Sequence, residues 1–463
     1  MGPNPVPAAP STSARVSHLS PGSAQLRTDE AIPHRITYIA IFVFTFVLYF
    51  RPYELFPSLA GLDSLAYWCA LFAIASYLVT QLACSKGLTI LTTETKCVLV
   101  MIASALLLMP FSRDVARSWE VFLDPFIRVM IIFLILANIL VTETRIKGLM
   151  WLGVAIGVYL SYQAYDLFQK GVFNTEETRV SVNFGGMFGN PNDLCIHLLI
   201  FIPISLALAK TSRSSLTKVI GCLAALLMMF AVLLTQSRGG FIGLVVVVTL
   251  LVWKVGQGKR LRALMLALAL LGSTIAIAPS SFGTRMMTLL NLSSDFGSSS
   301  GQRRENLERS ILVSLRNPQG VGLGNSRTFG VRNLETHNAY TQVSTELGLI
   351  AFFAYLVLLI VPFRDLWRME GETDKQMSMS TVSSLMIGTQ IAIAGYMVSS
   401  FFASVAYGWY VYFPIAYAVG FRVLYQNEKR AQADRSTHNG LEASLPIFVA
   451  PNQPILHEPR AES

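Results

Sequence analysis

VMIIFLILANILV, at residues 129–141, carries no charged side chain. Similar runs occur at 36–50 (ITYIAIFVFTFVLYF) and 241–253 (FIGLVVVVTLLVW). These runs are too uniformly apolar to be amphipathic, and with their flanks they approach the roughly 20 residues that cross bilayer hydrocarbon. The sequence therefore predicts an all-α fold, a polytopic bundle of transmembrane helices.

The composition of the whole chain favours the same fold. Of 463 residues, 53% are apolar and only 14% are charged, too little charge to cover a water-soluble body of this size. The formal charge of +9 is explained by basic loops at a membrane surface, and we expect no nucleic-acid partner. The five cysteines form no CxxC pair and have no histidine at metal-ligand spacing. We expect no disulfide, metal or cofactor.

About twelve spans are predicted from the apolar runs. They lie near 36–50, 62–83, 97–111, 126–141, 149–168, 194–209, 219–236, 239–254, 262–278, 346–362, 381–402 and 409–424. Lysine and arginine concentrate in alternate connections, as at Arg145 and Lys147, so the positive-inside rule puts both termini in the cytoplasm.

Three domains follow from this topology. Residues 1–35 are rich in Pro, Ser and Ala and are expected to form a disordered cytoplasmic leader. Residues 36–425 form the transmembrane domain, and the polar tail at 426–463 is expected to be disordered in the cytoplasm. Three segments are predicted on the side of the membrane opposite the cytoplasm. They are 169–193, the turn at 237–240, and a long loop at 279–345.

The long loop has a biased composition, because it contains seven arginines and no lysine. A guanidinium can hold a phosphate through two bonds, so this favours oxyanion binding, although a solvated loop that happens to lack lysine is equally compatible. Within the loop, residues 303–316 place Leu307, Ile311 and other apolar residues at helical spacing. This predicts an amphipathic helix that lies on the membrane plane or packs onto the bundle.

Three residues on this side are candidates for chemistry. In THNAYTQVSTELGLI (336–350), Thr336 is a plausible N-cap, and His337 in the first turn can act as a base, donate to a phosphate, or be only a polar end group. Arg238 lies in a turn at the membrane boundary, where it accompanies an anion or extends to lipid head groups.

The third candidate is Arg179, which precedes a glycine-rich stretch that ends in FGNPND (188–193). Asn192 or Asp193 can cap the helix that follows, and the stretch is either a re-entrant turn that lines a polar cavity or an ordinary loop. The predicted topology gathers all three candidates and the arginine loop on one side. The expected ligand is an anionic head group of a lipid. Almost no acidic pair is expected there, so a metal-free mechanism is the simpler hypothesis.

Four segments resemble the O-antigen ligase and polymerase family of bacterial envelope glycosyltransferases. They are FGNPND, SRGGFIGL (237–244), an Arg303-led helix that runs into NPQGVGLGN (317–325), and THNAY followed by ELG (346–348). Their order and spacing between residues 179 and about 360 are more specific than any single motif. One departure is Leu307, where members often carry tryptophan.

The resemblance implies a helical bundle in the bacterial inner membrane with one large periplasmic loop that contains the amphipathic helix. It also implies metal-independent, inverting transfer of a glycan from undecaprenyl diphosphate. Arg179 and Arg238 would hold the diphosphate, with Arg303 and Arg304 assisting. His337 would activate the acceptor hydroxyl or stabilise the leaving phosphate, and Arg238 would share in catalysis.

The acceptor is open at this stage. A ligase uses lipid A core, a polymerase uses a second lipid-linked glycan, and some relatives glycosylate protein. A polysaccharide flippase or secondary transporter, from another class of protein, would also have about twelve helices. That alternative predicts internal repeats and charges near mid-membrane, and neither is clear in the sequence.

Overall fold

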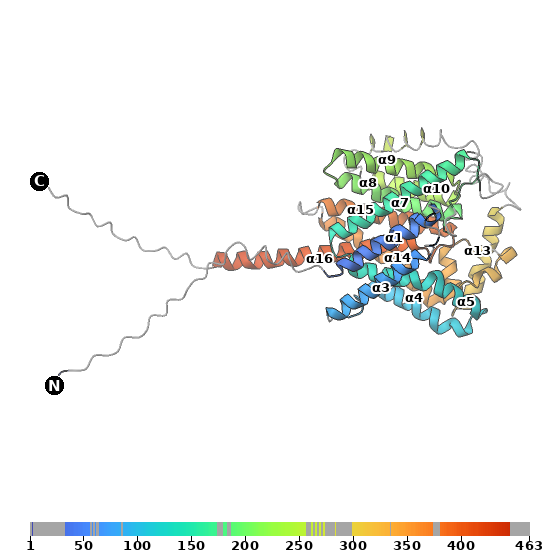
Figure 1. Ribbon diagram of the computed structural model, residues 1–463, viewed down its shortest axis with the longest axis horizontal. Helices are drawn as coiled ribbons and strands as arrows, with labels where there is room; N and C mark the ends of the chain where they lie inside the picture. The colour runs from blue at the N-terminus through green and yellow to red at the C-terminus, as the bar shows by residue number, and fades with distance from the viewer. Residues whose placement is uncertain are drawn as a thin grey trace.

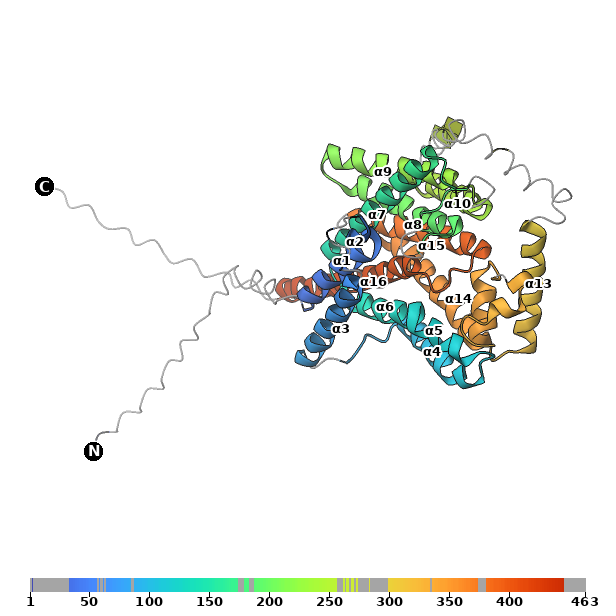
Figure 2. The ribbon, with the colours of Figure 1, turned by 45° about the vertical axis from the view of Figure 1, so that its right-hand side comes forward.

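The computed structural model is a bundle of helices from which one helix, α16, projects (Figure 1). It describes residues 33–444, except for gaps within 56–63 and at 85–86, 174–178, 183–186, 334 and 374–379, and with only scattered residues between 256 and 298. Every regular element in the described residues is a helix, which confirms the predicted all-α fold. A second view of the bundle sets α13 beside α14, with α4 and α5 nearby (Figure 2).

Eleven of the twelve predicted spans coincide with helices. These are α1 (Arg35–Phe50), α3 (Leu65–Ala83), α4 (Thr93–Leu108), α6 (Ile127–Ile139), α7 (Glu143–Gln169), α8 (Pro191–Thr211), α9 (Ser215–Leu234), α10 (Arg238–Val255), α14 (Ala339–Thr373), α15 (Ser380–Ser399) and α16 (Trp409–Ser444). Seven helical stretches among the described residues are long and apolar enough to cross a membrane. The chain is a multi-pass membrane protein, while the count of twelve crossings stays a prediction. The expected span at 262–278 and the start of the 279–345 loop lie outside the described residues.

Helix α8 is the centre of the bundle. It is the most buried of the seven stretches and packs against α7, α9, α10 and α15. Small residues permit this close approach, because a methyl group at Gly240 of α10 would collide with the Cys195 sulfur of α8. A methyl group at Gly243 would likewise collide with Ser399 of α15. The glycines of the SRGGFIGL segment therefore serve helix packing.

Helix α14 is broken at Gly348, whose φ of 82° and ψ of 177° are far from helical values. The 318–322 segment supplies the hydrogen bonds that the break removes. Gly322 N donates to Glu346 O at 3.0 Å, and Leu349 N donates to Pro318 O at 2.8 Å. At Gly320, with φ of 92°, an added Cβ would lie 2.7 Å from Glu346 O, so only glycine fits. The GVGLGN segment is thus a packed turn against α14.

The predicted amphipathic helix is present as α13 (Ser299–Arg316). Its small polar residues face the bundle, since Ser314 Oγ lies 2.9 Å from Ser344 Oγ and 3.0 Å from Thr345 Oγ1 of α14. Ile311, Leu312 and Leu315 are exposed on the outside. The helix therefore packs on the bundle and also presents an apolar face outward, so the two interpretations of this segment are compatible.

Helix α16 continues to Ser444, whereas the sequence analysis expected a disordered tail from residue 426. That expectation is wrong up to Ser444. The residues EKRAQA (428–433) are strong helix formers, and the ion pair of Lys429 with Glu372 of α14, at 2.7 Å, holds the start of the projecting part. Residues 445–463 lie outside the described part.

Buried ion pairs join the helices near the point where α16 leaves the bundle. Arg422 of α16 lies 2.9 Å from Glu94 Oε2 of α4 and 2.8 Å from Asp365 Oδ2 of α14. Lys254 of α10 pairs with Glu370 of α14. These residues belong to the predicted cytoplasmic ends, while α5 (Val115–Val121) and α13 lie toward the other end of the bundle (Figure 1).

Candidate functional site

Arg179 connects two of the segments that the sequence analysis brought together. Its side chain is only 6% exposed, its Nε donates to Thr235 O at 3.2 Å, and its Nη2 donates to Asn192 Oδ1 at 3.0 Å. The Ser237 hydroxyl donates to the same Asn192 oxygen at 2.7 Å. The 169–193 segment therefore lies against the turn that precedes α10.

Arg238 is the first residue of α10 and is half-buried. The preceding Ser237 acts as a cap, because its Oγ accepts a hydrogen bond from Gly240 N at 3.1 Å. Arg238 consequently stands at the start of a helix, next to the Arg179 network, where the amide groups of the first turn favour an anion.

His337 lies outside α14, contrary to the expectation that it stands in the first turn behind a Thr336 cap. The cap is Asn338, whose Oδ1 accepts hydrogen bonds from Tyr340 N at 2.9 Å and Thr341 N at 3.0 Å. His337 has a left-handed backbone with φ of 50°. The chain therefore turns at His337 before the helix starts, and the imidazole belongs to no face of α14.

A similar correction applies to α8. Its N-cap is Asn190, which accepts a hydrogen bond from Asn192 N at 2.9 Å, and Pro191 is the first helical residue. Proline suits this position because it needs no amide donor there. Asn192 and Asp193, the expected caps, lie inside the first turn and are free to serve other contacts.

The environment of His337 is cationic. Burial lowers the pKa of its imidazole, and the positive charges of Arg303, Arg179 and Arg327 lower it further, while Glu335 acts in the opposite direction. The structure thus brings Arg179, Arg303 and His337 together from three separate segments, as the sequence predicted. We call these residues, with Arg327, the cationic cluster.

Arg304 differs from its neighbour Arg303. Its side chain is 79% exposed and its Nε donates to Glu308 Oε1 at 3.0 Å, one turn along α13. Arg303 is half-buried. An assisting role for Arg304 stays a prediction, and in this structure its guanidinium is paired with Glu308.

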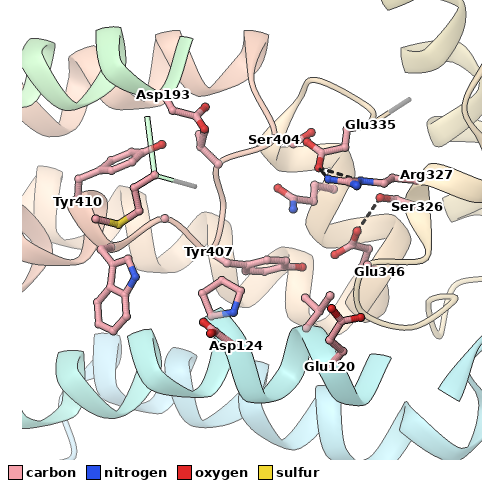
Figure 3. A pocket seen from close by; sticks show the side chains of 18 of the residues that line it. Glu120, Asp124, Asp193, Ser326, Arg327, Glu335, Glu346, Ser404, Tyr407 and Tyr410 are labelled. Carbon is pink, nitrogen blue, oxygen red and sulfur yellow. Dashed lines mark hydrogen bonds and ion pairs between the residues drawn. The ribbon is translucent and has the colours of Figure 1, made fainter. Parts of the chain in front are cut away.

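A cavity of about 350 Å³ adjoins the cationic cluster (Figure 3). Its lining includes Arg327 of the cluster and Glu335, which also acts on His337. Five carboxyl side chains line it, contributed by separate parts of the chain: Glu120, Asp124, Asp193, Glu335 and Glu346. The sequence analysis expected almost no acidic pair on this side that could bind a metal, and it did not predict this gathering of carboxyl groups. The carboxyl groups are far apart in sequence, and only the folded chain gathers them. Within the described residues, no three acidic, histidine or cysteine side chains are arranged to hold a metal ion.

The shared residues form an ion pair at the mouth of this cavity. Arg327 Nε donates to Glu335 Oε1 at 2.9 Å. Ser326 donates to Glu346 Oε1 at 2.6 Å, and Glu346 itself is 3% exposed. Sequence reasoning did not single out Arg327 or Glu335. The one sequence feature that could have indicated a role for Glu335 is its position two residues before His337.

The fold and the site define a class, a multi-pass membrane protein with a cationic cluster around a histidine beside an acidic cavity. Residues 223–356 match the family model described as O-Antigen ligase. This stretch contains Arg238, Arg303 and His337 and confirms the resemblance to the O-antigen ligase family drawn from the sequence. The match indicates an enzyme of the membrane glycan ligase or polymerase kind. No curated protein matches the chain.

Proposed function

We propose that the protein transfers a glycan from undecaprenyl diphosphate to an acceptor hydroxyl, with inversion at the anomeric carbon and without a metal ion. The observation that supports this most directly is the gathering of Arg179, Arg303 and Arg327 around His337. Guanidinium groups from separate segments suit a diphosphate, which carries several oxyanions that each accept two hydrogen bonds.

In the proposed reaction, the acceptor oxygen attacks the anomeric carbon from the face opposite the diphosphate. The new C–O bond forms as the bond to the phosphate oxygen breaks, and its electron pair leaves with the diphosphate. Arg179, Arg238 and Arg303 balance the developing charge, in the way that preorganised cations stabilise leaving groups. Arg304 would assist at the outer edge.

His337 is assigned the proton of the acceptor hydroxyl. Its pKa is lowered by burial and by Arg303, so its imidazole is neutral near neutral pH and has a lone pair available. Once protonated, the imidazolium adds a positive charge beside the leaving diphosphate. Both roles considered from the sequence, base and phosphate partner, can thus follow one another in a single turnover.

The proposed location is the bacterial inner membrane, with both termini in the cytoplasm and the cationic cluster on the periplasmic face. The donor would reach this face from the outer leaflet of the bilayer. The acceptor would be lipid A core for a ligase or a second lipid-linked glycan for a polymerase, and protein is the minor alternative.

Two substitutions test the assignment. Arg238→Ala and His337→Ala are expected to abolish glycan transfer while the protein still accumulates in the membrane. Lys218→Ala, at a predicted cytoplasmic connection, is the matched control for loss of a positive charge. Normal polysaccharide profiles on gels from both site variants would reject the proposal.

A deletion then identifies the reaction type. Loss of lipid A-linked polymer with lipid-linked chains accumulating indicates a ligase, and single-repeat products indicate a polymerase. Build-up of a lipid-linked substrate in the cytoplasmic leaflet would instead support a flippase or transporter and reject enzymatic transfer.

A further inference from the structure

The cavity beside the cationic cluster has two kinds of wall. One wall is aromatic. Phe188 stacks on Tyr49, with ring centroids 6.0 Å apart, and on Tyr410 at 6.2 Å, and Trp409, the residue before Tyr410, also lines the cavity. The other wall carries carboxyl groups. The volume of about 350 Å³ falls in the range of small-molecule sites, roughly 300–1,000 Å³.

The cavity is acidic overall, because its two guanidinium groups are already paired. Arg117 lies 2.7 Å from Glu120, and Arg327 pairs with Glu335. Of the remaining carboxyl groups, Asp124 pairs with Arg128 at 3.0 Å, so Asp193 and Glu346 are the two in the cavity lining that have no basic partner among the described residues. A phosphate or carboxylate placed in this cavity would meet like charge, whereas hydroxyl and amino groups would find acceptors.

Three buried polar atoms of the wall also lack a hydrogen-bond partner in the described part of the chain. They are Glu346 Oε2, the Tyr49 hydroxyl and the Tyr407 hydroxyl, on side chains 3%, 2% and 5% exposed. The Tyr407 hydroxyl faces the Glu346 carboxyl without reaching hydrogen-bonding geometry (Figure 3). Buried polar atoms are costly unless hydrogen-bonded, so these atoms indicate a polar occupant of the cavity.

We propose that this cavity is the acceptor-saccharide site and that it takes an uncharged or amino-bearing sugar, in preference to a phosphorylated or acidic one. The proposal rests on the function proposed above and deepens it. A sugar ring offers an apolar face, which suits the stacked aromatic rings, and a rim of hydroxyl donors, which suits the carboxylates. The Arg327–Glu335 pair at the shared mouth puts the bound sugar next to His337.

Asp193 is the specificity-determining carboxyl group in this arrangement. It extends from the first turn of α8 into the cavity, across from Glu335, and Tyr410 of the aromatic wall lines the same cavity. A carboxylate in this position binds an ammonium group through a charge-assisted hydrogen bond, which a neutral amide cannot form with equal strength.

The test measures sugar binding to the full-length protein in detergent by saturation-transfer NMR. Three probes are used: glucosamine, N-acetylglucosamine, and N-acetylglucosamine phosphorylated on its primary hydroxyl. We expect the first two to bind and the third to bind at least about tenfold more weakly, the size of one charge-assisted hydrogen bond. Equal or tighter binding of the phosphorylated probe, or no binding of any probe, would overturn the proposal.

Variants locate the binding. Trp409→Ala should remove the signal of both binding probes, while Trp68→Ala, at a side chain 59% exposed on α3, should retain it. Asp193→Asn should weaken glucosamine by about tenfold and N-acetylglucosamine less, and Asp166→Asn on α7 should change neither. Signals that survive both cavity variants would reject the site.

The binding assay is independent of the proposed reaction. Arg238→Ala should lose transfer but keep the sugar signal. If the sugar binds in the cavity but deletion of the protein leaves every envelope glycan unchanged, only the proposed glycan transfer is rejected. If Arg238→Ala abolishes transfer but Asp193→Asn and Trp409→Ala leave sugar binding unchanged, only the proposal of the acceptor-saccharide site is rejected.

Discussion

The cap of α14 supports the conformation of His337, and its removal should cost more activity than stability. Asn338 accepts two backbone hydrogen bonds, and replacing such a cap by alanine costs about 1 kcal/mol, up to roughly 2. The left-handed backbone of His337 costs about 1–2 kcal/mol for a residue other than glycine. The free energy that the Asn338 cap contributes is similar to the cost of the left-handed backbone at His337. Without the cap, therefore, no interaction offsets the backbone strain at His337. His337 then leaves its position in most molecules.

Asn338→Ala is therefore expected to lower the rate of glycan transfer about tenfold, since 1.4 kcal/mol corresponds to a factor of ten. The free energy of unfolding should fall by only about 1 kcal/mol. The assay compares transfer rates from a lipid-linked donor with thermal unfolding of the same preparations. Asn338→Ser is the matched control, because a serine hydroxyl caps helices nearly as well. Equal rates in the alanine and serine variants would refute the reasoning.

Three further predictions concern charge and packing. Removing the positive charge in Arg303→Gln favours the imidazolium form, so the pKa of His337 rises and the acid limb of the pH–rate profile moves to higher pH. Glu94→Gln removes the fully buried carboxylate charge that pairs with Arg422 and should lower the free energy of unfolding by about 3 kcal/mol, measured by denaturation. Gly240→Ala forces a methyl group against a sulfur of α8 and should reduce the amount of folded protein in the membrane, measured by immunoblot.

Each of these has a control. An acid limb that stays in place or moves to lower pH would contradict the electrostatic account of His337. Glu308→Gln breaks only an exposed pair with Arg304 and should change stability by less than about 1 kcal/mol. Cys195→Ala should partly restore the Gly240→Ala variant, because it removes the colliding sulfur. Additive losses in the double variant would argue against contact between the two sites.

The helices were predictable because long apolar runs leave few alternatives in a chain with so little charge. Their caps were less so. Thr336 and Asn338 are both good capping residues and stand two positions apart, as do Asn190 and Asn192. Which of them caps depends on how the preceding loop approaches the helix, and that approach is set by tertiary packing. The sequence analysis placed the cap two residues too early, at Thr336, and so put His337 inside the helix, whereas it lies before the first turn.

The arginines of the site were predictable, whereas its carboxyl groups were not. Arg179, Arg303 and His337 lie in segments whose side of the membrane follows from the charge of the connections. The acidic cavity depends on how the α5 region, the start of α8 and the 318–348 region pack together, and no local pattern encodes that contact. On α13, the sequence does not indicate that Ser314 faces α14, since small polar residues suit both a helix interface and solvent.

The break at Gly348 divides α14 into two mechanical parts. The short outer part, residues 339–347, carries Glu346 and follows directly on His337, and the 318–322 segment bonds to it through Thr345 and Glu346. The longer part continues toward α15 and α16. Helices in a bilayer tilt as its thickness changes. The 318–322 segment bonds to Glu346 before the break and to Leu349 after it, so tilting of the longer part would be transmitted to that segment instead of being absorbed at Gly348.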